Sequence, residues 1–347
     1  MPGSRRFGRI TRSLTLAAAI TALPVAALAD TPRERWHQDI ATGYQQLADH
    51  TQQLMDAGDS YCQAPDASGR RQLSGAWLQA FESWQQVRFV EFGPIEQDSL
   101  AWQFQFWPDA KNLVARKVNY WLSAETELTT ATIDGAGVAV QGFPALEFLL
   151  ADPRFQQSEQ ALPAERSCQL FNAVSSHIHA NALELQQQWQ AMKPHYLATD
   201  DYTHGTIRSA MNALEILQDR RMGAPMGLRG SGRRNPYLAD AWRSETSLAG
   251  IRASIEGLQR YFAPGLMAEL AAQGHADLGE QLNDAFEEVL GDLENAPAGM
   301  APLIEDDEGF GQLQSIYIDV VQLEQTLNND IAAALGVIRG FNSSDGD

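Results

Sequence analysis

The sequence predicts an all-α protein, and three observations lead to this prediction. Apolar residues recur at steps of three and four along most of the chain, runs that alternate apolar and polar residues are scarce, and glycines and prolines gather in a few short stretches. Such spacing places the apolar side chains on one face of each helix, and that face must be buried against other helices. We therefore expect antiparallel helical bundles joined by short loops.

The periodic segments can be followed from one end of the chain to the other. The first predicted helix covers residues 33–55, and its apolar stripe is formed by Trp36, Ile40, Tyr44, Leu47 and Leu54. The last predicted helix has the same spacing from Ile316 to Leu335. Between them we expect further helices at 72–92, 110–128, 161–193, 203–221, 240–262 and 276–295.

Length and composition divide the chain into two predicted lobes. A chain of 347 residues is too long for one small bundle. Residues 220–236, RRMGAPMGLRGSGRRNP, contain four glycines, two prolines and five arginines, which is typical of a loop. We therefore predict an N-terminal helical-bundle lobe at 30–222 and a C-terminal one at 237–347, joined by the loop 223–236.

Residues 1–29 have the three-part layout of a secretory signal peptide. Four arginines and no acid lie in the first twelve residues, a short alanine-rich apolar run follows, and Ala27-Leu28-Ala29 fits the small-x-small cleavage rule. The run is short for a membrane span, which disfavours the alternative of a retained anchor. We expect export with cleavage after Ala29, a periplasmic location if the cell is Gram-negative, and no transmembrane segment in the mature chain.

The chain is strongly acidic. It has 25 basic and 44 acidic residues, which give a net charge of −19, and loss of the four arginines of the predicted signal peptide would leave −23. Such a surface repels the phosphates of nucleic acids and anionic lipids, and it attracts cations. Nucleic acids are therefore excluded from the expected partners.

Cys62 and Cys168 are the two cysteines of the chain. An exported protein sits in an oxidising compartment, where disulfides persist. We predict that these two residues form one disulfide between distant helices. Two cysteines alone are too few for a structural zinc site.

The segment 141–150, QGFPALEFLL, places a glutamate in an otherwise apolar run. Pro144 has a fixed φ and no N–H, so we expect a helix to begin around it, with Glu147 in the first turn. Free N–H groups and the helix dipole would stabilise the carboxylate there. Two interpretations remain open: Glu147 is a carboxylate of a binding cleft, or it is a buried residue held by hydrogen bonds or an arginine.

Several segments occur along the chain in a recognisable order, and they are ESWQQVRFVEFGPIE, FWPD with KVNYWL, QGFPALEFLL, PYLADAWRSETSL and the C-terminal GFNSSDGD. Together they resemble the imelysin family of bacterial periplasmic and outer-envelope proteins. The resemblance implies two helical-bundle lobes with a cleft between them and a link to bacterial iron acquisition. Some members of the family are described as metallopeptidases.

The family hallmark, Gly-x-His-x-x-Glu, maps onto residues Gly142 to Glu147. Glycine and glutamate match, but Pro144 stands where the family has histidine, and proline offers no lone pair to a metal. The resemblance implies a ligand-binding cleft formed by Gly142, Phe143, Pro144, Glu147, Arg88, Trp107 and Arg243.

Iron, as Fe²⁺ or Fe³⁺, is the cofactor that the resemblance implies, and iron accepts carboxylate oxygens as ligands. Glu147 and Glu91 are the predicted metal ligands. If Arg88 or Arg243 faces Glu147 instead, the site becomes an ion pair or an anion pocket. Further candidate partners for Glu147 in the metal site are Glu96, Asp109 and Asp134.

The expected function is therefore binding. An exported protein of iron acquisition would hold a metal ion, a small ligand or another iron-uptake envelope protein in its cleft. A divergent metallopeptidase is the first alternative, although the chain has no His-Glu-x-x-His and no Gly-x-Ser-x-Gly, and no catalytic residue is assigned. An inert scaffold is the second. The residues expected to build the cores of the lobes include Trp84, Trp102, Trp107, Trp121 and Trp242.

Overall fold

The structure, a computed structural model, describes residues 1–4, 8, 30–230 and 232–338. Most of the predicted signal peptide and all of the C-terminal GFNSSDGD lie outside these residues. From Thr31 onward the chain forms one compact unit. Within the described part of this unit the regular elements are helices, and no strand is formed, which confirms the all-α prediction.

The long helices lie near their predicted positions, and shorter ones fill the connections. The α-helices are α1 (Pro32–Gln63), α2 (Ala67–Val87), α3 (Leu100–Phe104), α4 (Leu113–Ser123), α5 (Thr130–Asp134), α6 (Phe143–Ala151), α7 (Glu165–Ala198), α8 (Asp201–Ile216), α9 (Ser247–Gly257), α10 (Ala263–Ala272), α11 (Ala276–Glu294), α12 (Ala301–Glu305), α13 (Asp307–Gln325) and α14 (Ala332–Ala334). Short 3₁₀ turns are η1 (Gly93–Ser99), η2 (Val138–Val140), η3 (Phe155–Gln157) and η5 (Pro236–Leu238), and π-helical turns are η4 (Leu217–Gly223), η6 (Leu258–Phe262) and η7 (Thr326–Ile331).

The first group of helices is built around α1. This helix packs along α7 on one side and α2 on the other. Its stripe residues Trp36, Ile40 and Leu47 are fully buried, as their spacing predicts. A disulfide between Cys62 and Cys168, with a Cα–Cα distance of 5.8 Å, joins the end of α1 to the start of α7. The predicted cysteine pairing is therefore present.

The second group contains α8 to α13. Helix α13 packs against α11, α12 and α8, and Asn328, just after α13, donates hydrogen bonds to Met211 and Glu215 of α8. Helix α8 therefore lies with the second group, although its residues fall within the predicted N-terminal lobe. The chain passes between the groups near Thr199 and Asp200, before the predicted linker 223–236.

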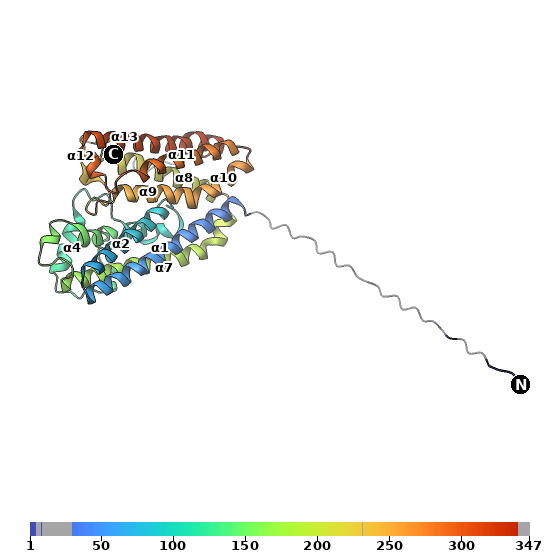
Figure 1. Cartoon of the computed structure of the whole chain (residues 1–347), viewed down its shortest axis with the longest axis horizontal. Helices are drawn as coiled ribbons and strands as arrows, with labels where there is room; N and C mark the ends of the chain where they lie inside the picture. Colours follow the sequence, from blue (N-terminus) through green and yellow to red (C-terminus); the bar gives the residue numbers. More distant parts are fainter. Residues whose placement is uncertain (5–7, 9–29, 231, 339–347) are drawn as a thin grey trace. The chain divides into compact units, whose positions relative to one another are not determined.

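The two groups meet where α2 packs on α9 and where α1 packs on α10. Figure 1 shows α1, α2 and α7 in blue to green beside the second group in yellow to red. Among the described residues, no helix is both long enough and apolar enough to cross a membrane.

One helix prediction is wrong at its start. We expected a helix over 240–262, but α9 begins at Ser247, and residues 239–246 form a loop. Ala241 and Glu245 have positive φ values of 48° and 55°, which a helix does not allow. The polar side chains of this loop bond to α6 and to buried arginines instead, as described next. Tertiary hydrogen bonds thus replace the first turns of the predicted helix.

Candidate functional site

Helix α6 is placed against the C-terminal end of α3 by Gly142. A Cβ atom at Gly142 would lie only 2.2 Å from the carbonyl oxygen of Phe104, so no other residue fits without movement of the backbone. Phe143 follows at the first helical position and is fully buried, and its carbonyl accepts a hydrogen bond of 3.2 Å from Trp77. Gly142 and Phe143 therefore position α6, and neither is among the residues that line the cavity described below.

Pro144 occupies the second position of α6 and is half-buried, and its ring lines a cavity. The proline conformation suits a helix start, as predicted. The expectation that Glu147 lies in the first turn is wrong, because α6 begins at Phe143 and Glu147 is its fifth residue. The helix amides at the N-terminus are therefore not what stabilises the Glu147 carboxylate.

Glu147 receives its hydrogen bonds from the loop 239–246. Both the N–H and the hydroxyl of Ser244 donate to Oε1 of Glu147, each over 2.9 Å. The side chain is 3 % exposed, and burial raises the pKa of Glu147 to about 7. The Ser244 N–H, the charge of Arg243 and the Ser244 hydroxyl oppose this rise in pKa, while the charge of Asp240 adds to it. Glu147 is thus a buried acid that changes charge near neutral pH.

Arg243 does not form a bidentate pair with Glu147, which was one of the alternatives that the sequence left open. Its Nε donates to Asp152, the residue after α6, over 3.0 Å, and its Nη2 donates to Asn112 over 2.9 Å. The guanidinium also lies 4.4 Å from the ring centre of Trp242. Arg243 therefore neutralises Asp152 and leaves Glu147 without a direct cationic partner among the described residues.

A second buried network surrounds Asp240. Arg221 donates to Asp240 over 3.0 Å, and the Gln105 amide donates to both oxygens of the same carboxylate over 2.8 and 2.7 Å. The carbonyl oxygen of Gln105 in turn accepts from Trp84 and Arg88. This network fastens the loop 239–246 to both groups of helices.

Five residues of these networks were not predictable as site residues from the sequence, and they are Asp240, Arg221, Gln105, Asp152 and Ser244. Asp240 and Ser244 lie in the segment PYLADAWRSETSL, which was one of the signals of the family. Arg221 reaches the core because α8 continues into the π-helical turn η4, a change of period that the apolar spacing does not report.

Four of the predicted cleft residues line one cavity of about 640 Å³, here called the Glu147 cavity. These residues are Pro144, Glu147, Trp107 and Arg243. Further aromatic side chains line the cavity, and they are Phe106, Trp242 and the exposed Tyr237. This volume is in the usual range for a small-molecule site.

Arg88 lines a neighbouring cavity of about 580 Å³, here called the Arg88 cavity. The two cavities share Trp107 and Pro108 as a common wall. Glu91 belongs to the Arg88 cavity, where its side chain is exposed and accepts a hydrogen bond from Asn212. The structure therefore does not bring Glu91 to Glu147.

The other acids considered as metal ligands have local structural partners. Asp109 accepts from the N–H groups of Leu113 and Val114 at the start of α4, and Glu96 accepts from the N–H of Gly93. The Asp134 carboxylate lies 3.8 Å from His177. Within the described residues, no group of three or more His, Cys, Asp or Glu side chains could hold a metal ion. The residues around Glu147 therefore do not fit a resident iron ion bound by the protein alone.

The tryptophans expected in the cores differ in burial, and they fall into three classes. Trp84 is buried and stacks on Phe104 at 4.7 Å, as expected. Trp102 is 46 % exposed, so the prediction that it is a core residue is wrong. It lies on the short helix α3 at the edge of the Arg88 cavity. Three others are half-buried, and they are Trp107, Trp121 and Trp242.

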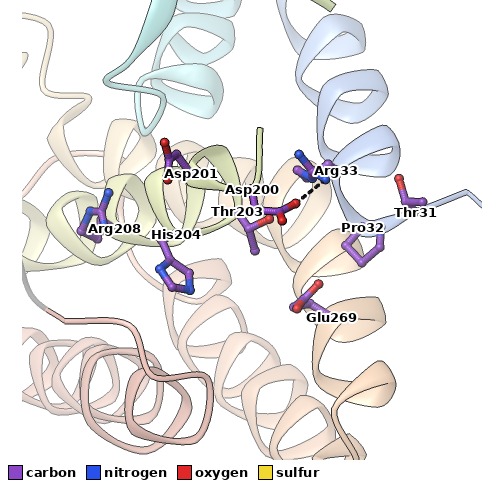
Figure 2. Close-up of a pocket in the computed structure, with 9 residues that line it drawn as sticks. All are labelled: Thr31, Pro32, Arg33, Asp200, Asp201, Thr203, His204, Arg208 and Glu269. Atoms are coloured by element: carbon purple, nitrogen blue, oxygen red, sulfur yellow. Dashed lines mark hydrogen bonds and ion pairs between the residues drawn. The ribbon is translucent and has the colours of Figure 1, made fainter. Parts of the chain in front are cut away.

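A third cavity, of about 470 Å³, lies where the starts of α1 and α8 approach α10. Figure 2 shows Arg33 turned toward Asp200, with His204 and Arg208 projecting from α8 and Glu269 from α10. Arg33 is occupied by Asp200 and by carbonyl groups at the end of α7. No segment that signalled the family contributes to this cavity.

Comparison with known proteins assigns the family. The family model described as Imelysin, which is also labelled as a peptidase family, matches residues 40–327. The chain belongs to the imelysin family. No curated protein sequence matches it. The family assignment confirms the resemblance carried by the segments around Glu147 and Asp240.

Two solved structures have similar folds. An imelysin-like protein from Psychrobacter arcticum 273-4 is 21% identical with a TM-score of 0.77, and the match covers 90% of this chain and 99% of that one. An iron-regulated protein A precursor from Parabacteroides distasonis ATCC 8503 is 14% identical with a TM-score of 0.68, covering 89% of this chain and 97% of that one. At these identities the similarity establishes the imelysin fold.

Proposed function

We propose that this imelysin is an exported ligand-binding protein of bacterial iron acquisition, and that its ligand occupies the Glu147 cavity. The observation that carries the proposal is the combination of burial, cavity lining and hydrogen bonding at Glu147. It lines a cavity of about 640 Å³, is buried, and both hydrogen bonds from Ser244 end on one carboxylate oxygen. A buried carboxylate with unused acceptor capacity favours a ligand that completes its hydrogen bonds.

The link to iron rests on the family and on the iron-regulated protein from Parabacteroides distasonis, which has the same fold. In our proposal iron is a cargo and not a resident cofactor. Glu147 would supply one oxygen ligand, and the remaining ligands would come from water or from a chelating organic molecule, because the described residues offer no further cluster. The aromatic walls formed by Trp107 and Trp242 suit an organic chelator better than a bare ion.

Export to the periplasm is part of the same proposal. It rests on the layout of residues 1–29 and agrees with the disulfide between Cys62 and Cys168, which requires an oxidising compartment. A bound envelope partner would have the rim of the cavity available, where Tyr237 and Leu238 are exposed.

A metallopeptidase function gains no support from the geometry around Glu147. Hydrolytic zinc sites use three protein ligands and an open position. Pro144 replaces the histidine of the family hallmark, and Arg243 and Asp152 are engaged with each other. The described residues around Glu147 therefore do not form the set of ligands that a zinc peptidase uses.

Calorimetric titration of the metal-stripped mature chain tests the proposal. The titrants are Fe²⁺, ferric citrate and citrate alone, and zinc serves as the metal control. We expect one-site binding of ferric citrate that is lost in Glu147→Gln, because the amide cannot act as an anionic oxygen ligand. Glu91→Gln is the matched control, since Glu91 lies in the neighbouring cavity and should leave the affinity unchanged.

The outcomes of this titration either identify the ligand of the Glu147 cavity or contradict the proposal. Equal binding of citrate and ferric citrate would assign the cavity to the organic anion rather than to iron. Loss of binding in Glu91→Gln but not in Glu147→Gln would move the site to the other cavity and contradict the proposal. No binding by any titrant would also contradict it.

A further inference from the structure

Arg88 differs from the other two arginines of the buried networks in how much of its bonding capacity is used. The side chains of Arg221 and Arg243 are 3 % and 6 % exposed, and each donates to a carboxylate over 3.0 Å. The Arg88 side chain is 24 % exposed, and its closest approach to Asp240 is 3.6 Å, beyond a hydrogen bond. Its bond to Gln105, over 3.0 Å, uses one of five N–H groups.

Asp240 gives Arg88 only a long ion pair of 3.6 Å, while closer donors bond to the same carboxylate. Arg221 and both contacts of the Gln105 amide end on it. The guanidinium of Arg88 instead lies over Trp107, 5.7 Å from the ring centre, and faces the Arg88 cavity. A charged donor with spare N–H groups on an aromatic platform is suited to a planar anionic group.

The walls of the Arg88 cavity supply a second cation and flat apolar surfaces. Arg220, an exposed residue of η4, lines the cavity together with Trp84, Trp102 and Trp107. The 46 % exposure of Trp102 leaves a large aromatic surface at the cavity edge without protein cover. An apolar surface of this kind inside a polar-rimmed cavity is typical of ligand sites.

Two acids also line this cavity, and both are engaged by the protein. Glu91 accepts from Asn212, and Glu96 accepts from the backbone N–H of Gly93 at the start of η1. Arg88 and Arg220 are the two cationic side chains among the residues that line the cavity.

We propose that the Arg88 cavity is a second binding site, which takes an aromatic carboxylate. The carboxylate would bind the free N–H groups of Arg88 and the charge of Arg220, and the ring would stack against Trp102. This site lies beyond the common wall of Trp107 and Pro108, and it does not depend on the ligand of the Glu147 cavity.

Calorimetric titration of the mature chain with naphthoate tests the site, and naphthamide is the uncharged isostere. We expect saturable binding of naphthoate at one site, on the order of tenfold tighter than naphthamide, because the charged group gains charge-assisted hydrogen bonds. Inorganic phosphate, an anion without a ring, should bind weaker than naphthoate.

Three variants locate the site. Arg88→Lys keeps the charge but loses the planar fork, and should weaken naphthoate binding by about tenfold. Arg220→Gln and Trp102→Ala change exposed side chains, so they keep the fold, and each should weaken binding by roughly fivefold. Arg208→Gln, an exposed arginine of α8 that lines the cavity of Figure 2, is the matched control and should have no effect. Far-ultraviolet circular dichroism checks the fold of each variant.

The proposal is overturned if naphthamide or phosphate binds as tightly as naphthoate, or if Arg220→Gln and Trp102→Ala leave the affinity unchanged. Loss of naphthoate binding in Glu147→Gln would also overturn it, because that result would assign the ligand to the other cavity. Retained naphthoate binding in Glu147→Gln would support the second site, whatever the titration with ferric citrate gives.

Discussion

Glu147 and Asp152 are two buried carboxylates at one helix, and they have opposite electrostatic environments. Both are almost inaccessible, with 3 % and 0 % exposure. Two consecutive residues of one loop bond to them, Ser244 to Glu147 and Arg243 to Asp152. The neighbouring partners differ in charge, and this difference decides which acid stays ionised.

Burial by itself would raise the pKa of both acids. At Asp152 the hydrogen bonds from Arg243 and from the N–H groups of Phe155 and Arg154 outweigh burial, so its pKa lies below the usual value. At Glu147 the hydrogen bonds from the neutral donors of Ser244 do not outweigh burial, and the pKa of Glu147 rises to about 7. Asp152 is thus an ionised structural residue that holds the loop in place. Glu147 is the acid whose protonation state a ligand can change.

The largest expected effect comes from moving both acids together. Gly142→Ala would bring a Cβ atom against the Phe104 carbonyl and displace the start of α6. We expect a loss of about 3 kcal/mol or more in the free energy of unfolding, because a backbone atom cannot give way as a side chain can. Urea unfolding measures it. Gly137→Ala, at a glycine whose added Cβ would have open space, is the control and should change little.

Removal of the cation from Asp152 is next in size. Arg243→Gln leaves a buried carboxylate without its charge partner, and we expect a cost of about 3 kcal/mol at pH 7. In the double variant Arg243→Gln with Asp152→Asn, most of that loss should return, because no buried charge remains. If the double variant is less stable than Arg243→Gln, the ion pair is not the source of the effect.

Glu147→Gln should act in the opposite direction, and its effect should depend on pH. An acid whose pKa is raised on folding binds more protons in the native state, so wild-type stability falls as pH rises from about 4.5 to about 7. We expect Glu147→Gln to be equal to wild type near pH 4.5 and more stable above pH 7, by up to about 3 kcal/mol. Urea unfolding at several pH values measures the difference.

Asp152 provides the contrasting pH profile. Its pKa is lowered on folding, so its contribution to stability is present above the unfolded value of 3.8 and is lost as pH falls through the lower folded value. The destabilisation caused by Asp152→Asn should therefore shrink in acid. Parallel pH profiles for Glu147→Gln and Asp152→Asn would contradict the contrast between the two acids.

The smallest expected effect concerns the neutral donors. Ser244→Ala removes the hydroxyl bond to Glu147 and keeps the N–H bond, and we expect a cost of about 1 kcal/mol at pH 8. The pKa of Glu147 should rise further, because a donor to its charged form is lost. A Ser244→Ala variant in which Glu147 titrates lower than in wild type would show that the hydroxyl is not its donor.

Many of the helices around these two acids were predictable from the sequence, because their apolar spacing has a direct physical meaning. Apolar residues spaced by three and four can be buried only on a helix face, so the stripe from Trp36 to Leu54 predicted α1 correctly. Pro144 indicated the start of α6 through its fixed φ and missing N–H, which are local properties. These properties are carried by the residues themselves.

The loop 239–246 was not predictable in the same way. Its apolar spacing favours a helix, but Asp240, Arg243 and Ser244 each bond to a residue far away in the sequence. The identity of such partners depends on tertiary packing. Arg243, which the sequence offered as a partner for Glu147, therefore pairs with Asp152 instead. For the same reason the sequence suggested Glu91 as a ligand beside Glu147, whereas the fold places it in another cavity.

Direct titration of Glu147 would show whether its carboxyl group changes charge near neutral pH. Carbon-13 NMR of labelled side-chain carboxyls, with Glu147→Gln and Asp152→Asn to assign the signals, follows both acids in one experiment. We expect a titration midpoint near 7 for Glu147 and one below 3.8 for Asp152. A Glu147 midpoint near 4.5, the ordinary value, would contradict this expectation.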